Sequence, residues 1–154
     1  MTEHFATVTW QRGADTFARG RYSRRHQWRF DGGAEVTASA SPHVVPAPWS
    51  DPAGADPEEA YVAALSSCHM LWFLSLAAAQ GFVVDHYEDA AVGHMREVAP
   101  QRLIIAQVVL RPRVAFDPAH AAAPQQVEAL HHAAHERCFL ANSVKTEIRI
   151  EARG

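Results

Sequence analysis

A run of twenty residues, 60–79, contains no Asp, Glu, Lys or Arg, and this run constrains the fold more than any other feature. Asp56 is a good N-cap before it, Pro57 suits the first helical position, and Glu59 follows three residues after the cap. Gly81 stands where such a helix would end. The pattern predicts a helix of about 24 residues, roughly 36 Å long, that is apolar all round and therefore buried.

A run of this length could also span a bilayer. We favour a core helix instead, because the run contains Ser66, Ser67, His69 and Ser75 and lacks basic flanks. A single small domain has difficulty burying such a helix on every side, whereas a dimer that sandwiches it would succeed. The first residues, Met1-Thr2-Glu3-His4, lack a basic stretch followed by an apolar one, so we expect no signal peptide and no membrane partner.

Length and charge limit the classes of function. With 154 residues the chain is expected to form a single domain, 1–154, and its formal net charge of −3 provides no basic field for nucleic acid. Two cysteines are too few for a secreted disulfide scaffold, so we expect a cytoplasmic protein. No GxSxG, P-loop or GxGxxG motif is present, which gives no support to hydrolase, NTPase or dinucleotide-binding functions.

The rest of the sequence predicts an α+β fold with the element order β-β-β-α-β-α-β. The turn signal Asp31-Gly32-Gly33 predicts a hairpin, and the alternation over 144–152 predicts a half-buried final strand. The other expected segments are strands at 4–10, 17–30, 35–40 and 102–116, strand or connecting segments at 82–87 and 90–97, and a second helix at 124–138. The strand that begins at 102 could end near Pro112. Five Pro and Gly residues mark 41–55 as an irregular loop.

The chain has two cysteines, one on each expected helix. Cys68 lies in the middle of the apolar helix and Cys138 at the end of the second helix, seventy residues later. Two cysteines placed in this way suggest a thiol pair that meets in space and carries redox chemistry, although free cysteines are also common as inert core residues. Cys68 lies too deep in its helix for the dipole to stabilise a thiolate, and a helix C-terminus disfavours one at Cys138. Cys68 is the better nucleophile candidate, provided that side-chain cations surround it.

Two segments resemble the OsmC/Ohr family. They are Asp56-Pro57-Glu58-Glu59-Ala60 with the cysteine that follows at position 68, and Cys138-Phe139-Leu140-Ala141-Asn142-Ser143-Val144 before the final strand. The element order matches over nearly the whole chain. The resemblance implies antiparallel sheets packed around a long central helix, in an intertwined homodimer with its active sites at the interface.

The resemblance also implies a function. The family contains thiol-dependent peroxidases that reduce organic hydroperoxides to alcohols, with Cys68 in the peroxidatic position and Cys138 in the resolving position, and a disulfide between them. A small dithiol, lipoyl-type in the best-known branch, would supply the reducing equivalents. No cofactor and no metal is implied.

In the family, a glutamate at the position of Glu58 pairs with an arginine that holds the thiolate. The loop before Glu58 contains no Arg or Lys, so Arg24 and Arg25 of the early strands are the best candidates, unless they belong to a solvated edge strand. Glu58 and Cys68 are ten residues apart, about 15 Å along one helix and roughly 80° around it. Glu58 should therefore not reach its own Cys68, whereas an antiparallel second copy could bring its glutamate near.

Two alternatives remain open at this point. His131 and His135 are one turn apart and Cys138 follows three residues later, a spacing that could serve zinc, although no CxxC or HExxH motif is present. The chain could instead be a non-catalytic redox sensor, or bind an apolar ligand under the apolar loop residues Val44, Val45 and Trp49. His69 points about 100° away from Cys68 on a helix, so we expect it to line a pocket or pack. His132 and its neighbours could also simply lie on a tolerant, alanine-rich helix surface.

Overall fold

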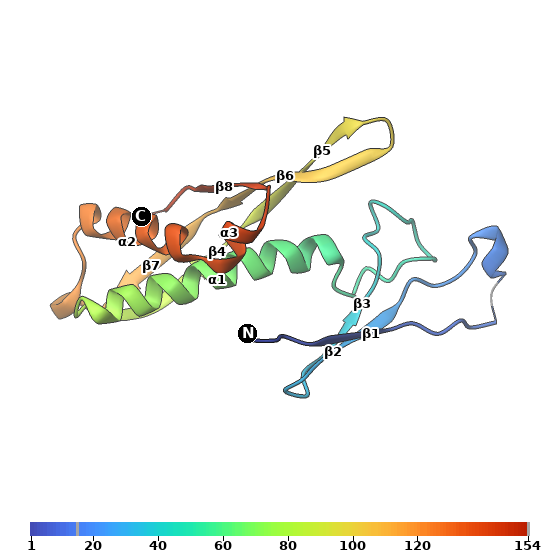
Figure 1. Ribbon diagram of the computed structural model, residues 1–154, viewed down its shortest axis with the longest axis horizontal. Helices are drawn as coiled ribbons and strands as arrows, with labels where there is room; N and C mark the ends of the chain where they lie inside the picture. The colour runs from blue at the N-terminus through green and yellow to red at the C-terminus, as the bar shows by residue number, and fades with distance from the viewer. Residues whose placement is uncertain (15, 154) are drawn as a thin grey trace. The chain divides into compact units, whose positions relative to one another are not determined.

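The computed structural model of the protein describes residues 1–14 and 16–153. The chain forms two compact units, Met1–Ala60 and Tyr61–Gly154, and the boundary falls in the first turn of helix α1 (Pro57–Ala79). The first unit carries an antiparallel three-stranded sheet in the order β1-β2-β3 (Figure 1). Its strands are β1 (Ala6–Thr9), β2 (His26–Phe30) and β3 (Glu35–Ala38).

The predicted hairpin of the first unit is confirmed. Gly33 adopts a φ of 89°, which favours glycine, and its N–H donates to the Phe30 carbonyl at 3.0 Å. The prediction of a strand from residue 17 is wrong up to residue 25. A 3-10 helix, Phe17–Arg19, ends at Gly20 with a φ of 72°, and this left-handed residue breaks the extended chain before β2.

The predicted ends of helix α1 are also confirmed. The Asp56 carboxylate accepts a hydrogen bond from the Glu59 N–H at 2.7 Å, and the Glu59 carboxylate accepts one from the Asp56 N–H at 3.2 Å. This reciprocal pair satisfies two backbone donors that the helix start would otherwise leave unpaired. At the other end Gly81 has a φ of 82°, and the Phe82 N–H donates to the Ala77 carbonyl at 3.0 Å.

The second unit contains two sheets. An antiparallel pair joins β4 to β7, and a three-stranded sheet has the order β5-β6-β8, in which β8 runs parallel to β6. The strands are β4 (Val84–Asp89), β5 (Val92–Ala99), β6 (Arg102–Leu110), β7 (Pro112–Phe116) and β8 (Glu147–Ile150). The single strand predicted at 102–116 is therefore two strands. They part at Arg111, whose N–H donates to the Asp89 carboxylate at 2.6 Å, so that the chain changes from one sheet to the other.

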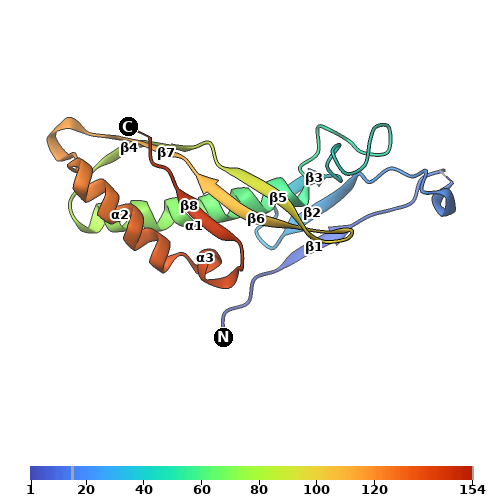
Figure 2. The same ribbon diagram turned by 90° about the horizontal axis from the view of Figure 1, so that it is seen from above.

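Helices α1 and α2 (Pro124–Arg137) lie side by side in opposite directions, as Figures 1 and 2 both show. Their contact forms one core cluster, in which Phe73 and Ala77 of α1 meet Leu130 and Ala134 of α2. A second cluster joins the first half of α1 to the β5-β6-β8 sheet through Leu65, Val108 and Leu110. The second unit is therefore held together by α1, which contributes to both clusters.

Helix α1 is only partly covered within the chain. Its buried residues form one stripe, Leu65, His69, Phe73 and Ala77, and Leu71 on another face is exposed. Only 22% of its most apolar 18-residue stretch is buried. This helix is long enough and apolar enough to cross a membrane. The core helices of soluble proteins can have the same length and composition. The complete burial predicted from the sequence is thus not reached within one chain.

The core position of Phe73 predicts a large loss of stability on truncation. We expect Phe73→Ala to lower the free energy of unfolding by about 3–5 kcal/mol. Phe73 is 0% exposed, so removal of its ring leaves a cavity in the core into which the neighbouring side chains relax only partially. Phe139→Ala is the matched control in the same unit, since Phe139 is 69% exposed and its loss should cost less than about 1 kcal/mol. Urea unfolding measures both, and equal losses would contradict the described core.

Candidate functional site

The packing of the second unit brings Cys68 and Cys138 together. Cys68 is half-buried on α1, and Cys138 is buried between α2 and the short helix α3 (Phe139–Ser143). Both thiols are free, and Cys68 lies close enough to Cys138 to raise its pKa. Neighbouring thiols are the groups that a disulfide joins, provided that the two Cα atoms lie within about 7 Å of each other.

Cys138 lies at a junction that the sequence did not predict. Helix α2 ends at Arg137, one residue earlier than expected, and Cys138 is both its C-cap and the N-cap of α3, where its sulfur accepts a hydrogen bond from the Ala141 N–H at 3.4 Å. Burial nevertheless raises the pKa of Cys138 to about 11. The neighbouring Cys68 thiol acts in the same direction, and the Ala141 N–H opposes both. Burial prevails, so Cys138 remains a protonated thiol at neutral pH.

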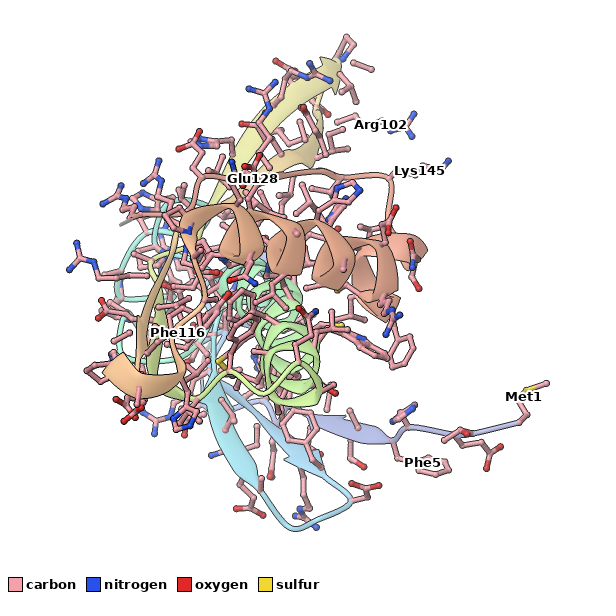
Figure 3. All side chains as sticks on the ribbon, turned by 90° about the vertical axis from the view of Figure 1, so that its left-hand side faces the viewer. Met1, Phe5, Arg102, Phe116, Glu128 and Lys145 are labelled. Carbon is pink, nitrogen blue, oxygen red and sulfur yellow. The ribbon has the colours of Figure 1, made fainter. Side chains whose placement is uncertain are left out.

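Aromatic side chains lie on the same helices as the two cysteines. Trp72 follows Cys68 by one helical turn, and its ring meets the edge of Phe139 with centroids 5.5 Å apart. The Arg137 guanidinium lies 5.8 Å from the centre of the Trp72 ring. Arg137 is not among the cations predicted for the thiol site, although it directly precedes Cys138 in the sequence. Two other cations of this unit, Arg102 and Lys145, point outward (Figure 3).

Glu58 lies in the first turn of α1, half-buried. The capping hydrogen bonds use Asp56 and Glu59, and among residues 1–14 and 16–153 no hydrogen bond or ion pair of the Glu58 side chain is present. Because α1 is continuous from Pro57 to Ala79, Glu58 is about 15 Å along the axis from Cys68 of the same chain. Glu58 therefore has a free carboxylate and no access to its own Cys68.

Arg24 and Arg25 lie in the loop before β2, within the first unit, and not on a strand. The Arg24 guanidinium donates to the carbonyls of Gly20 and Tyr22 at 2.8 and 2.7 Å, and covers the Tyr22 ring at 3.6 Å. Arg25 forms an ion pair with Asp51 at 2.8 Å. Both cations have partners within their own unit, and their assignment to the thiolate stays a prediction.

Two buried histidines face each other across the contact of α1 with α2. His69 of α1 and His131 of α2 are 1% and 4% exposed, and His69 Nε2 is 3.0 Å from His131 Nδ1. The pKa of His69 is lowered to about 4. Burial is the largest cause, and the nearby imidazoles of His131 and His135 add to it. Burial also lowers the pKa of His131 to about 4, although Asp89 opposes this. Both rings are therefore neutral at pH 7.

The histidines of α2 do not form the surface cluster that the sequence allowed. His131 is buried, whereas His132 is exposed and faces Glu136 at 3.5 Å. The zinc alternative is not supported either, because the described part of the chain contains no group of three or more His, Cys, Asp or Glu residues that could hold a metal ion. His131 is engaged with His69, and Cys138 with Cys68.

Comparison with known proteins gives a consistent result. Residues 50–153 match the family model of the OsmC-like protein. An OsmC-like protein of unknown function from Vibrio cholerae is 52% identical, with a TM-score of 0.96 over 99% of this chain and 100% of that one. Organic hydroperoxide resistance proteins from Elizabethkingia anophelis and Bacillus subtilis share the fold at 16% and 15% identity. The Elizabethkingia anophelis protein has a TM-score of 0.70, and the match covers 99% of this chain and 94% of that one. The Bacillus subtilis protein has a TM-score of 0.68, and the match covers 99% of this chain and 98% of that one. No curated protein matches this chain.

The histidine pair predicts a loss of stability in acid. In the unfolded chain each imidazole takes up a proton near pH 6.5, whereas in the folded protein it does so only near pH 4. The free energy of unfolding should therefore fall as the pH drops from 6.5 to 4 and should not depend on this pair above 6.5. At about 1.4 kcal/mol per pKa unit, the loss is on the order of 3 kcal/mol for each ring.

Urea unfolding across this pH range measures the effect. Carboxylates also titrate in acid, so the effect of the histidine pair is isolated by comparing the native protein with variants. The double variant His69→Phe, His131→Leu should show a shallower dependence between pH 6.5 and 4, and His132→Gln, on the exposed face of α2, should retain the native slope. Identical slopes in all three proteins would contradict the assignment of neutral buried rings.

Proposed function

Because the chain belongs to the OsmC-like protein family, we propose that it is a thiol-dependent peroxidase that reduces organic hydroperoxides to alcohols. The observation that carries the proposal is the contact between Cys68 and Cys138, which are seventy residues apart in sequence and the only cysteines of the chain. The organic hydroperoxide resistance proteins of the same fold support the choice of substrate class. A reducing cytoplasm, where free thiols persist, is the compartment that suits this chemistry.

Cys68 is the peroxidatic thiol in this proposal, because it is the more accessible of the two. Its thiolate attacks the terminal oxygen of the hydroperoxide, the O–O bond breaks, and the departing alkoxide takes a proton and leaves as the alcohol. Cys68 is left as a sulfenic acid. The surrounding Trp72 and Phe139 rings, with Met70 on the same helix, provide an apolar surface that suits bulky organic peroxides better than hydrogen peroxide.

Cys138 is the resolving thiol, because it is buried against Cys68. Its sulfur attacks the sulfenic sulfur, the S–O bond breaks, and hydroxide takes the Cys138 proton and leaves as water. The product is a disulfide between Cys68 and Cys138. A small dithiol of the lipoyl type then reduces this disulfide by thiol exchange and becomes a cyclic disulfide itself.

A homodimer completes the proposed site. The uncovered apolar surface of α1, which includes the exposed Leu71, is the kind of surface that a second copy of the chain would bury. An antiparallel α1 from the partner would bring a second Glu58 towards Cys68. In this arrangement Glu58 holds Arg24 or Arg25 beside the thiolate, whose negative charge the guanidinium stabilises.

Substitution of the cysteines tests the two thiol roles. We expect Cys68→Ser to abolish reduction of cumene and tert-butyl hydroperoxide, since the chain has no other accessible nucleophilic sulfur. Cys138→Ser should react once and stop at the sulfenic acid. Peroxide consumption and intact mass measure both: the native chain loses two hydrogens on oxidation, and Cys138→Ser gains one oxygen. Unchanged turnover by Cys68→Ser would overturn the proposed activity.

Mixed dimers test the contribution of Glu58 across the interface. Neither the Cys68→Ser homodimer nor the Glu58→Gln homodimer should turn over at the native rate. A co-expressed heterodimer of the two contains one complete site if Glu58 acts on the partner, and should recover about half of the native activity. An inactive heterodimer would show that Glu58 acts within its own chain, and a Glu58→Gln homodimer with native turnover would show that Glu58 does not act at all. Glu59→Gln, at the neighbouring capping position, is the control and should remain active as a homodimer.

A further inference from the structure

Helix α2 is attached to the second unit by few buried side chains. Its 14 residues include three buried ones, and these are Leu130, His131 and Ala134. They pack against the second half of α1, where the centroids of the Phe73 and His131 rings are 4.4 Å apart. One of the three side chains that hold α2 in place is therefore an imidazole, which takes up a proton in acid.

His131 bonds to His69, the one histidine of α1. His69 Nε2 and His131 Nδ1 are 3.0 Å apart, and the two ring planes differ by 8°. A neutral imidazole has one N–H donor and one acceptor nitrogen, so two neutral rings share a single proton in this bond. When both rings are protonated, every nitrogen carries an N–H and the bond is lost. The contact between α1 and α2 thus contains a bond that needs at least one neutral ring.

The surroundings of the pair do not neutralise a positive charge. Both rings are almost completely buried. In residues 16–153, which the structure describes without a gap, neither ring has a hydrogen bond or an ion pair with a carboxylate, and the outer nitrogens, His69 Nδ1 and His131 Nε2, have no hydrogen-bond partner. A proton on either ring therefore places a charge in the core, which burial penalises.

The titratable groups around the pair come from three elements, and they are Cys68 of α1, His135 of α2, and Tyr87 and Asp89 of β4. His135 acts with burial to lower the pKa of His69. Asp89 raises the pKa of His131, but burial outweighs it and the value is still about 4. The Asp89 carboxylate is also engaged elsewhere, since it accepts hydrogen bonds from the Ser66 hydroxyl and the Arg111 N–H.

The other core cluster of the second unit contains no such group. Leu65, Val108 and Leu110 are its buried members, and the side chains that pack around them include no histidine and no carboxylate. This cluster joins the first half of α1 to the β5-β6-β8 sheet. Acid therefore charges the contact of α1 with α2 and leaves the contact of α1 with this sheet uncharged.

Helix α2 depends on its contact with α1 for its own helical structure. Isolated helices of about 12–15 residues are marginal in water, and α2 has 14 residues. His131 and His135 are one turn apart, so their protonated rings repel each other along the helix. An α2 that leaves α1 therefore exposes its backbone amides to exchange with water.

We propose that the His69–His131 bond is a pH-sensitive switch, which opens the contact of α1 with α2 when both rings are protonated. The β5-β6-β8 sheet stays packed on the first half of α1 in the open state. Cys138 is the C-cap of α2, so the opening also removes this buried thiol from Cys68. The switch separates the two thiols in acid whether or not the chain reduces peroxides.

Proton uptake sets the size of the effect. An exposed imidazole takes up a proton near pH 6.5, whereas the two buried rings do so only near pH 4. A shift from pH 7 to pH 5 therefore multiplies the equilibrium constant for opening roughly twentyfold for each ring, and about 500-fold for the pair.

Hydrogen exchange of the full chain, read by mass spectrometry at pH 7 and pH 5, tests the switch. Protection factors, which are corrected for the intrinsic exchange rate at each pH, report the opening equilibrium. We expect the protection factors of the α2 amides to fall by about 10²- to 10³-fold between the two values. At pH 5 they should be at least tenfold lower than those of β6 at Val108–Leu110, because those amides exchange only when the whole unit unfolds.

Two variants assign the effect to the pair. The double variant His69→Phe, His131→Leu has no ring to protonate at this contact, so the protection of its α2 should change less than tenfold between pH 7 and pH 5. His132→Gln is the matched control, since His132 is exposed on the same helix, and it should show the native fall.

Equal protection of α2 and β6 at pH 5 would show that only the whole unit unfolds, and would overturn the switch. Unchanged α2 protection in the native protein would overturn it too, as would a native-sized fall in the double variant. The comparison of α2 with β6 within the native protein decides the question even if the double variant fails to fold.

Discussion

The antiparallel packing of α1 against α2 is the contact on which the rest of the second unit depends. Phe73 and Ala77 meet Leu130 and Ala134 in one buried cluster, and burial of these side chains fixes the register of the two helices. The same register places Cys68 beside Cys138 and His69 beside His131. Slippage by one turn would separate both pairs, so the stability of the core and the chemistry of the thiols have one origin.

Burial decides the protonation of the groups along this contact. At Cys138 the short helix α3 offers a backbone N–H to the sulfur, yet removal from water outweighs that donor and keeps the thiol protonated. At His69 and His131 the same effect keeps the imidazoles neutral. Burial therefore keeps all three of these side chains uncharged at neutral pH.

Local signals were enough for the elements whose ends are set by their own residues. The Asp56–Glu59 capping pair and Gly81 bound α1 as predicted, and Asp31-Gly32-Gly33 turns the hairpin. The segment 102–116 was predicted as one strand because its apolar residues are nearly continuous. It is divided at Arg111 because the backbone there bonds to Asp89, a residue of another strand that no local pattern identifies.

The sequence by itself determined that Cys68 lies in the middle of a long apolar helix, which Asp56, Glu59 and Gly81 bound. It also determined the resemblance to the family, since that rests on residues close together in the chain. Only the tertiary structure decided that the thiols meet, that Cys138 is buried and begins α3, and that His131 faces His69 in the core. Contact, burial and pKa depend on neighbours more than sixty residues away, which the packing of the helices brings together.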